Sequence, residues 1–189
     1  IQHAAYIAGL LLSGLTVPMA LAAVPGGWLS ERYGYRTPTV AGLALAAAGF
    51  LLTGLVWEAD TSYWLMAAQM ALIGIGLGLT ISPIGTAAIN DVGRDERGSA
   101  AALILILRLV GMTVAISSLT VFALARFDAV LPSYAAAAGE QAEDAMLATQ
   151  SASLEAAVAV ISELQFIGAA ASILALLAAI WLRGGQRSP

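Results

Sequence analysis

Hydrophobic and polar positions along this chain separate into long blocks rather than alternating residue by residue. Apolar runs with almost no charge are divided by short polar segments. A bilayer core of about 30 Å is crossed by about 20 helical residues, so each run is long enough to span it. Five membrane-spanning helices are therefore predicted, over Ala4–Val24, Pro38–Trp57, Tyr63–Ile89, Ser99–Ala125 and Ile161–Leu182.

The composition supports a membrane protein. Hydrophobic residues make up 60% of the chain, charged residues 11%, and the mean hydropathy is +0.87. Soluble domains are about 45–50% apolar and about 25% charged, so a soluble fold could not hide this much apolar surface. A membrane β-barrel would show short alternating segments instead of continuous runs. The predicted class is an all-α, polytopic membrane protein. With no cysteine, the chain has no disulfide and no thiolate metal site.

The arginines predict the topology. The chain has no lysine, and six of its eight arginines follow the first, third and fifth runs. By the positive-inside rule these segments are cytoplasmic, which puts the first residues outside and the C-terminus inside. The six residues are Arg32, Arg36, Arg94, Arg97, Arg183 and Arg187.

Five of the eleven acidic residues outside the runs fall in one segment, Phe127–Val160. It is rich in alanine, and we expect a helical loop that lies in solvent or at the membrane interface; a binding lid over the external mouth is the alternative. The chain then divides into four spans over 1–126, an extracytoplasmic loop over 127–160, the last span over 161–182 and a cytoplasmic tail over 183–189. Because Ile1 is not a methionine and enters an apolar run directly, we expect the chain to come from inside a longer protein and the tail to be its true C-terminus.

A charged, glycine-punctuated turn separates the first two runs and reads Gly-Trp-Leu-Ser-Glu-Arg-Tyr-Gly-Tyr-Arg over 27–36. We expect Gly27 to permit close helix packing and Gly34 to adopt a left-handed turn conformation. The charges of Glu31, Arg32 and Arg36 lie at helix ends, where they can meet opposite charges or helix dipoles. This turn is called the signature loop below.

The signature loop resembles that of the major facilitator superfamily of secondary transporters, with the pattern G-x-x-x-[D/E]-R-x-G-x-[R/K]. Here Glu31 replaces the usual aspartate and Tyr35 replaces a common basic residue, which removes one cation. The resemblance implies that the five spans are helices two to six of the C-terminal six-helix half. Further features resemble the fourteen-span drug:proton antiporter branch: Gly9, Pro18, Met19, Gly74, Gly76, Gly78, Pro83, Gly98, Ser99, Ala100, Arg108 and Gly111.

The resemblance implies efflux of small amphipathic solutes from the cell by proton antiport, in the inner membrane and without a cofactor. Proton coupling needs a titratable group at membrane depth. The predicted spans contain no acid except Glu163, near the external end of the last. We therefore expect the coupling acid in the N-terminal half, which the chain lacks.

Three glycines and a proline distinguish the third run. Gly74 and Gly78 share one helix face, Gly76 lies between them, and Pro83 removes a backbone hydrogen bond. These residues, with Gly111 in the fourth run, indicate either close helix packing or a flexing gate. A nucleotide-binding loop is excluded, because the chain has no lysine and the glycines lie in a span.

Arg108 is the most distinctive single residue. It lies nine residues beyond Ser99, so about 13 Å into the helix and close to mid-membrane. A charge at that depth is costly and normally faces a protein interior or a water-filled cavity. The alternative is that Arg108 snorkels to the cytoplasmic interface. Gln69, Asn90 and Gln165 are the other polar residues of the spans, and they indicate interhelical hydrogen bonds or contacts along a substrate pathway.

The rival function is a non-catalytic membrane assembly or channel subunit. Membrane enzymes are disfavoured, because prenyl transferases need clustered acids and intramembrane serine proteases need a deep histidine. The sole histidine, His3, lies at the outer edge of the first run, and every aspartate lies in a predicted loop. The sequence indicates neither a metal site nor a nucleic-acid interface.

Overall fold

The computed structural model describes residues 2–58, 60–90, 92–141 and 145–181. Within these ranges the chain is helical and has no strand, which confirms the predicted all-α class. Five helices are long and apolar enough to cross a membrane. The elements are α1 (Gln2–Tyr33), α2 (Arg36–Val56), α3 (Tyr63–Asn90), the short 3-10 helix η1 (Arg94–Glu96), α4 (Arg97–Gln141) and α5 (Ala145–Trp181).

The two ends of the bundle differ. The signature end holds the turn at Gly34 and the turn at Gly93. The hairpin end holds the turn after Trp57 and the last residues of α4, up to Gln141. The predicted tail 183–189, together with Glu143 and Asp144 of the predicted loop, lies outside the described residues.

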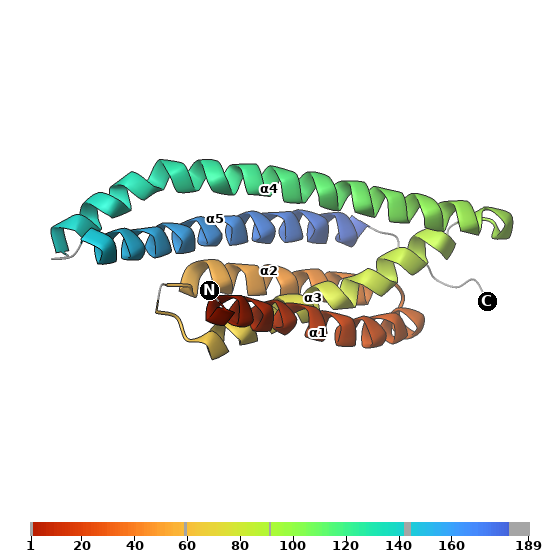
Figure 1. Cartoon of the computed structure of the whole chain (residues 1–189). Coiled ribbons are helices and arrows are strands. Elements are labelled where there is room, and N and C mark those ends of the chain that lie inside the picture. Colours follow the sequence, from red (N-terminus) through yellow and green to blue (C-terminus); the bar gives the residue numbers. More distant parts are fainter. Residues whose placement is uncertain (1, 59, 91, 142–144, 182–189) are drawn as a thin grey trace.

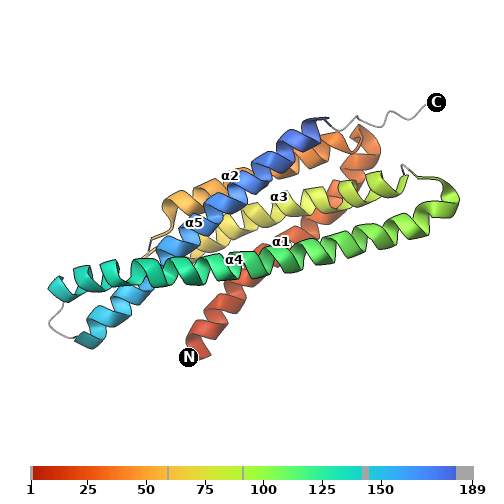
Figure 2. The same ribbon diagram turned by 90° about the horizontal axis from the view of Figure 1, so that it is seen from above.

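α3 is the central helix of the first three. It packs extensively against both α1 and α2, which touch each other much less. α5 lies on α2, and α4 lies on α5, so that the helices form successive layers (Figure 1). In the perpendicular view, α4 and α5 cross at a shallow angle (Figure 2).

Small residues form the core because the helices approach closely. A Cβ added at Gly42 would lie 2.6 Å from the carbonyl oxygen of Gly76, and one at Gly49 would lie 2.7 Å from Cγ1 of Ile73. Such distances are too short for any side chain, so these positions exclude even alanine without a shift. Large apolar side chains instead cover the outside, as expected where lipid is the solvent.

At two places the helices continue beyond the apolar runs from which the spans were predicted. α1 does not end at Val24 but continues through Pro25 to Tyr33, so most of the signature loop is helical. The segment Phe127–Val160 is no separate loop, because α4 and α5 continue through its described residues as a hairpin. The prediction that this segment is helical holds for those residues, and its suggested role as a lid stays a prediction.

The hairpin of α4 and α5 extends past the other helices (Figures 1 and 2). The hydroxyl of Ser162 donates a hydrogen bond to the carbonyl oxygen of Gly54, 2.9 Å away and two residues before α2 ends. Ala145 precedes Ser162 by 17 residues, so α5 begins about 25 Å beyond this bond. The buried alanines in that part of α5, at positions 148, 152 and 156, are therefore covered by α4.

Candidate functional site

The signature loop combines a helix end with a tight turn. α1 ends at Tyr33, and α2 begins at Arg36. Between them Gly34 has φ +81°, a left-handed conformation that glycine adopts without steric cost. Gly27 lies on the face of α1 that meets α3, where an added Cβ would be 2.9 Å from the hydroxyl oxygen of Ser82.

The charges of the loop are exposed. The guanidinium of Arg32 lies 5.5 Å from the ring centre of Trp28 and 5.8 Å from that of Tyr33. Both distances allow a cation–π attraction. Within the described part of the chain, neither Glu31 nor Arg36 forms an ion pair.

Tyr35 has a partner that the sequence did not reveal. The side-chain amide of Asn90 donates a hydrogen bond to its phenol oxygen over 2.6 Å. The two residues lie 55 positions apart, and the bond ties the signature loop to the last residue of α3. The sequence indicates an interhelical hydrogen bond or a substrate contact for Asn90 but does not identify its partner.

The glycines of α3 face both neighbouring helices. Gly74 and Gly78 lie against the backbone of α1, where an added Cβ would collide with the carbonyl oxygens of Leu15 and Met19. Gly76 faces the opposite neighbour, and a Cβ there would lie 2.7 Å from the carbonyl oxygen of Gly42 on α2. The close packing suggested by this spacing is therefore present.

Pro83 lies inside α3 and is fully buried, yet the helix continues past it to Asn90. Nearby hydroxyls donate to backbone carbonyls, from Thr80 to Leu77 over 2.7 Å and from Thr86 to Ser82 over 2.9 Å. Gly111 on α4 differs from the α3 glycines, because a Cβ there would meet no atom within 4 Å. A packing role for Gly111 within the described residues is excluded, and a flexing role stays a prediction.

The two glutamines assigned to a substrate pathway have different surroundings. Gln69 is 7% exposed, and its side-chain oxygen accepts a hydrogen bond from the indole nitrogen of Trp57 over 2.6 Å. This bond joins the hairpin end of α2 to α3, so Gln69 makes an interhelical hydrogen bond, and a place in a substrate pathway stays a prediction. Gln165 is half-buried on α5 and hydrogen-bonds to no other described residue through its side chain.

Arg108 lies in a part of α4 that other helices hardly cover. Every residue from 101 to 120 is exposed except Ile104, which is half-buried. In the described ranges Arg108 forms no ion pair. The structure therefore brings Arg108 together with none of the other predicted site residues.

The sequence did not predict the one salt bridge among the described residues. It joins Arg126 on α4 to Glu163 on α5, with the Nε of Arg126 donating to Oε2 of Glu163 over 2.7 Å and Nη2 donating to Oε1. Glu163 is the only acid inside a predicted span, and Arg126 directly follows the predicted span Ser99–Ala125. Their common position, at the ends of two predicted spans that lie towards the hairpin end, was the available clue.

Comparison with known proteins identifies the family. The chain matches the Major Facilitator Superfamily over residues 2–187. It is 34% identical over 137 residues to a triacylglyceride transporter of Mycolicibacterium hassiacum, a match that covers 67% of this chain and 25% of that protein. The corresponding protein of Mycolicibacterium smegmatis is 32% identical over 155 residues, covering 77% of this chain and 27% of the relative.

A third relative, a triacylglyceride transporter of Mycobacterium tuberculosis strain H37Rv, is 32% identical over 144 residues, which cover 70% of this chain and 27% of that protein. The chain thus spans about a quarter of the length of these relatives. The family match extends over all five membrane-length helices. The chain belongs to the Major Facilitator Superfamily.

Proposed function

We propose that this chain is part of a secondary transporter that moves a neutral lipid of the triacylglyceride class by alternating access. The observation that carries the proposal is the family match over residues 2–187, which coincides with five membrane-length helices. In such transporters two helical bundles rock against each other around a central site. The described helices would supply most of one bundle, and the remaining length seen in the relatives would supply the other.

The nature of the helices supports a neutral lipid as cargo. Relatives that are 32–34% identical are named triacylglyceride transporters. A triacylglyceride has no charge, so its acyl chains need apolar surface, while its ester carbonyls can accept hydrogen bonds from a donor such as Arg108. From Thr37 to Trp57 and from Tyr63 to Asn90 the chain has no charged residue. A path along α2 and α3 would therefore suit a solute of low polarity.

Drug:proton antiport is the second candidate, supported by the resemblance of the glycine and proline pattern to that branch. Its cargo would be a small amphipathic solute, and its coupling acid would lie in the part of the protein beyond this chain. Under either candidate the signature end faces the cytoplasm, as the arginine distribution indicates. The charges of Glu31, Arg32 and Arg36 would hold this end closed, and Arg108 would line the transport path.

Transport by the complete protein tests the proposal. The protein is reconstituted into vesicles, and movement of a fluorescent triacylglyceride and of a lipophilic cationic dye is measured with and without a proton gradient. Triacylglyceride movement, reduced by Arg108→Leu, is the expected result. Dye movement that requires the gradient, without lipid movement, would favour drug:proton antiport. Movement of neither cargo would favour the assembly or channel subunit.

A further inference from the structure

We propose that the Arg126–Glu163 ion pair is a positioning element. It fixes the rotation of α4 about its own axis, and thereby holds Arg108 on the side of α4 that faces α5. The proposal rests on the proposed function for the role of Arg108 in transport. Its structural part, the rotation of α4, is independent of the cargo.

The geometry of the ion pair fixes the relative orientation of its two charged groups. Two nitrogens of Arg126 donate to the two carboxylate oxygens of Glu163, so the planes of both groups are fixed relative to each other. The side chains are only 43% and 37% exposed. Opposite charges next to apolar helices strongly favour remaining paired, because an unpaired charge in lipid is costly.

The pair lies where α5 changes its neighbour. Glu163 directly follows Ser162, whose hydroxyl bonds to α2 near the end of that helix. Towards the signature end α5 packs on α2, with the ring of Phe166 against Gly54 and the ring of Phe50 against Gly168. Towards the hairpin end α5 is covered by α4 along its buried alanines. The ion pair thus marks the end of the close α4–α5 contact.

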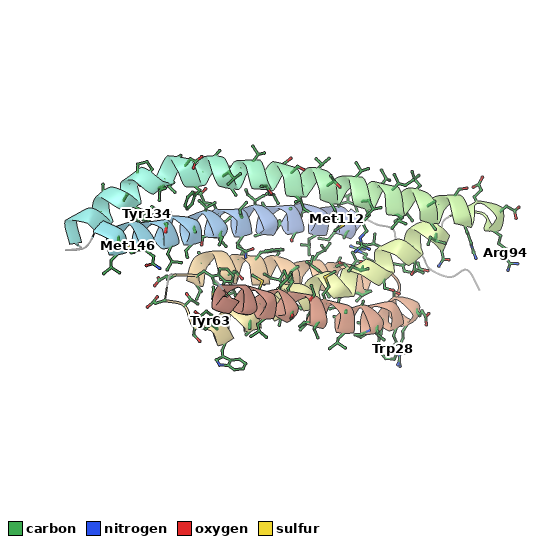
Figure 3. The ribbon with its side chains drawn as sticks, in the orientation of Figure 1. Trp28, Tyr63, Arg94, Met112, Tyr134 and Met146 are labelled. Carbon is green, nitrogen blue, oxygen red and sulfur yellow. The ribbon has the colours of Figure 1, made fainter. Side chains whose placement is uncertain are left out.

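The helical repeat places Arg126 and Arg108 on the same side of α4. The two residues are 18 positions apart, which is about five turns, so they share one side of α4 at a separation of about 27 Å. Leu119 and Phe122 lie on the same side, and at 37% and 38% they are less exposed than the other large apolar side chains of α4 between 105 and 124. Figure 3 shows Met112, one turn from Arg108, on the side of α4 that faces α5.

The part of α4 around Arg108 has no comparable restraint of its own. Its residues are almost all exposed, and between 97 and 138 no other side chain of α4 forms a hydrogen bond to another described helix. Alanine contacts resist separation of two helices but resist rotation weakly, because they are small and not directional. The rotation of this part of α4 therefore depends on the Arg126–Glu163 pair.

Spin-label distances in the complete protein test the positioning. Labels are attached to cysteines replacing Met112 on α4 and Leu177 on α5, each 14 residues from the ion pair towards the signature end. A rotation by one residue step, about 100°, moves a side chain by about 8 Å on a helix about 10–12 Å wide. Glu163→Gln and Arg126→Gln should each shift or broaden the distance distribution on this scale. The charge-swapped protein, Arg126→Glu with Glu163→Arg, should restore it.

Glu155→Gln is the matched control, since Glu155 is an exposed acid on the same helix and forms no ion pair within the described chain. Its distance distribution should equal that of the wild type. An unchanged distribution in Glu163→Gln would overturn the proposal, even if transport fell. If Glu163→Gln does not fold, Arg126→Lys, which keeps the charge without the bidentate fork, should broaden the distribution, and an unchanged one would equally reject it. Shifted distances in a protein that moves no lipid would reject the proposed function and leave the positioning intact.

Discussion

The phenol oxygen of Tyr35 accepts a hydrogen bond from the side-chain amide of Asn90, 2.6 Å away, and this bond closes the signature end of α3 onto the loop between α1 and α2. Tyr35 occupies a position where the family commonly has a cation. A neutral hydrogen bond therefore stands where a charged contact is usual. Tyr35 is half-buried and Asn90 is exposed, so the bond is weaker than a fully buried one.

Removing this bond should have a modest and specific effect. An intramolecular hydrogen bond contributes about 0.5–1.5 kcal/mol, so Tyr35→Phe and Asn90→Ala should each change the transport rate by about two- to tenfold. The double variant should change it no further, because both single variants remove the same bond. Tyr33→Phe is the control, as Tyr33 has no hydrogen-bonded hydroxyl among the described residues. Additive effects of the two substitutions would show that the bond is unimportant.

The glycines of α3 predict a sharp contrast in stability within one helix. Gly76→Ala would place a Cβ against the backbone of Gly42 and Ala46, and such overpacking costs about 1–3 kcal/mol. Gly85→Ala meets no atom within 4 Å and should be neutral or stabilising, since alanine favours helix by about 1 kcal/mol. Melting of the two variants in detergent measures the difference. Equal melting temperatures would mean that α2 and α3 are not packed as described.

Substitutions at Arg108 distinguish its two possible roles, which are lining a water-filled path and snorkelling to the interface. If its guanidinium faces a water-filled path, Arg108→Lys keeps the charge but loses the planar donor geometry, so transport should fall while the protein stays folded. Arg108→Leu should abolish transport and leave or raise thermal stability, because it removes a charge from mid-membrane. Unchanged transport in Arg108→Lys, together with lower thermal stability of Arg108→Leu, would instead support snorkelling to the interface.

The proposed topology can be checked in intact cells, because the chain contains no cysteine. A cysteine at Gln150, in the hairpin, should react with a membrane-impermeant maleimide from outside. A cysteine at Arg94, in η1 at the signature end, should react only after the cells are permeabilised. The opposite pattern would reverse the orientation inferred from the arginines.

Most of the fold follows from the hydrophobic pattern, and its errors have physical causes. The hydrophobic pattern indicates where the apolar residues end. A helix, however, ends only where its backbone hydrogen bonds end. α1 therefore passes Val24 and stops at Gly34, the residue with positive φ. The same reason explains α4 and α5, which continue as helices through an acidic segment that was expected to be a loop.

The site was less predictable, because partners distant in sequence decide it. Local spacing identified the faces of Gly74 and Gly78, since both contacts lie on one helix. It did not predict that Gln69 binds Trp57, which lies across a turn, or that Arg126 meets Glu163, 37 positions away. The mid-membrane depth expected for Arg108 comes from counting residues, and whether its side chain faces a water-filled path stays a prediction.

The central place of α3 has a consequence for biosynthesis. α1 and α2 leave the ribosome before α3, and each packs mainly on α3 rather than on the other. Until α3 enters the membrane, the face of α2 that carries Gly42 and Gly49 has no glycine-lined partner and lies against lipid. Assembly of the three helices must therefore wait for the insertion of α3, and a ribosome stalled before Tyr63 would leave α1 and α2 in the membrane without the helix on which both pack.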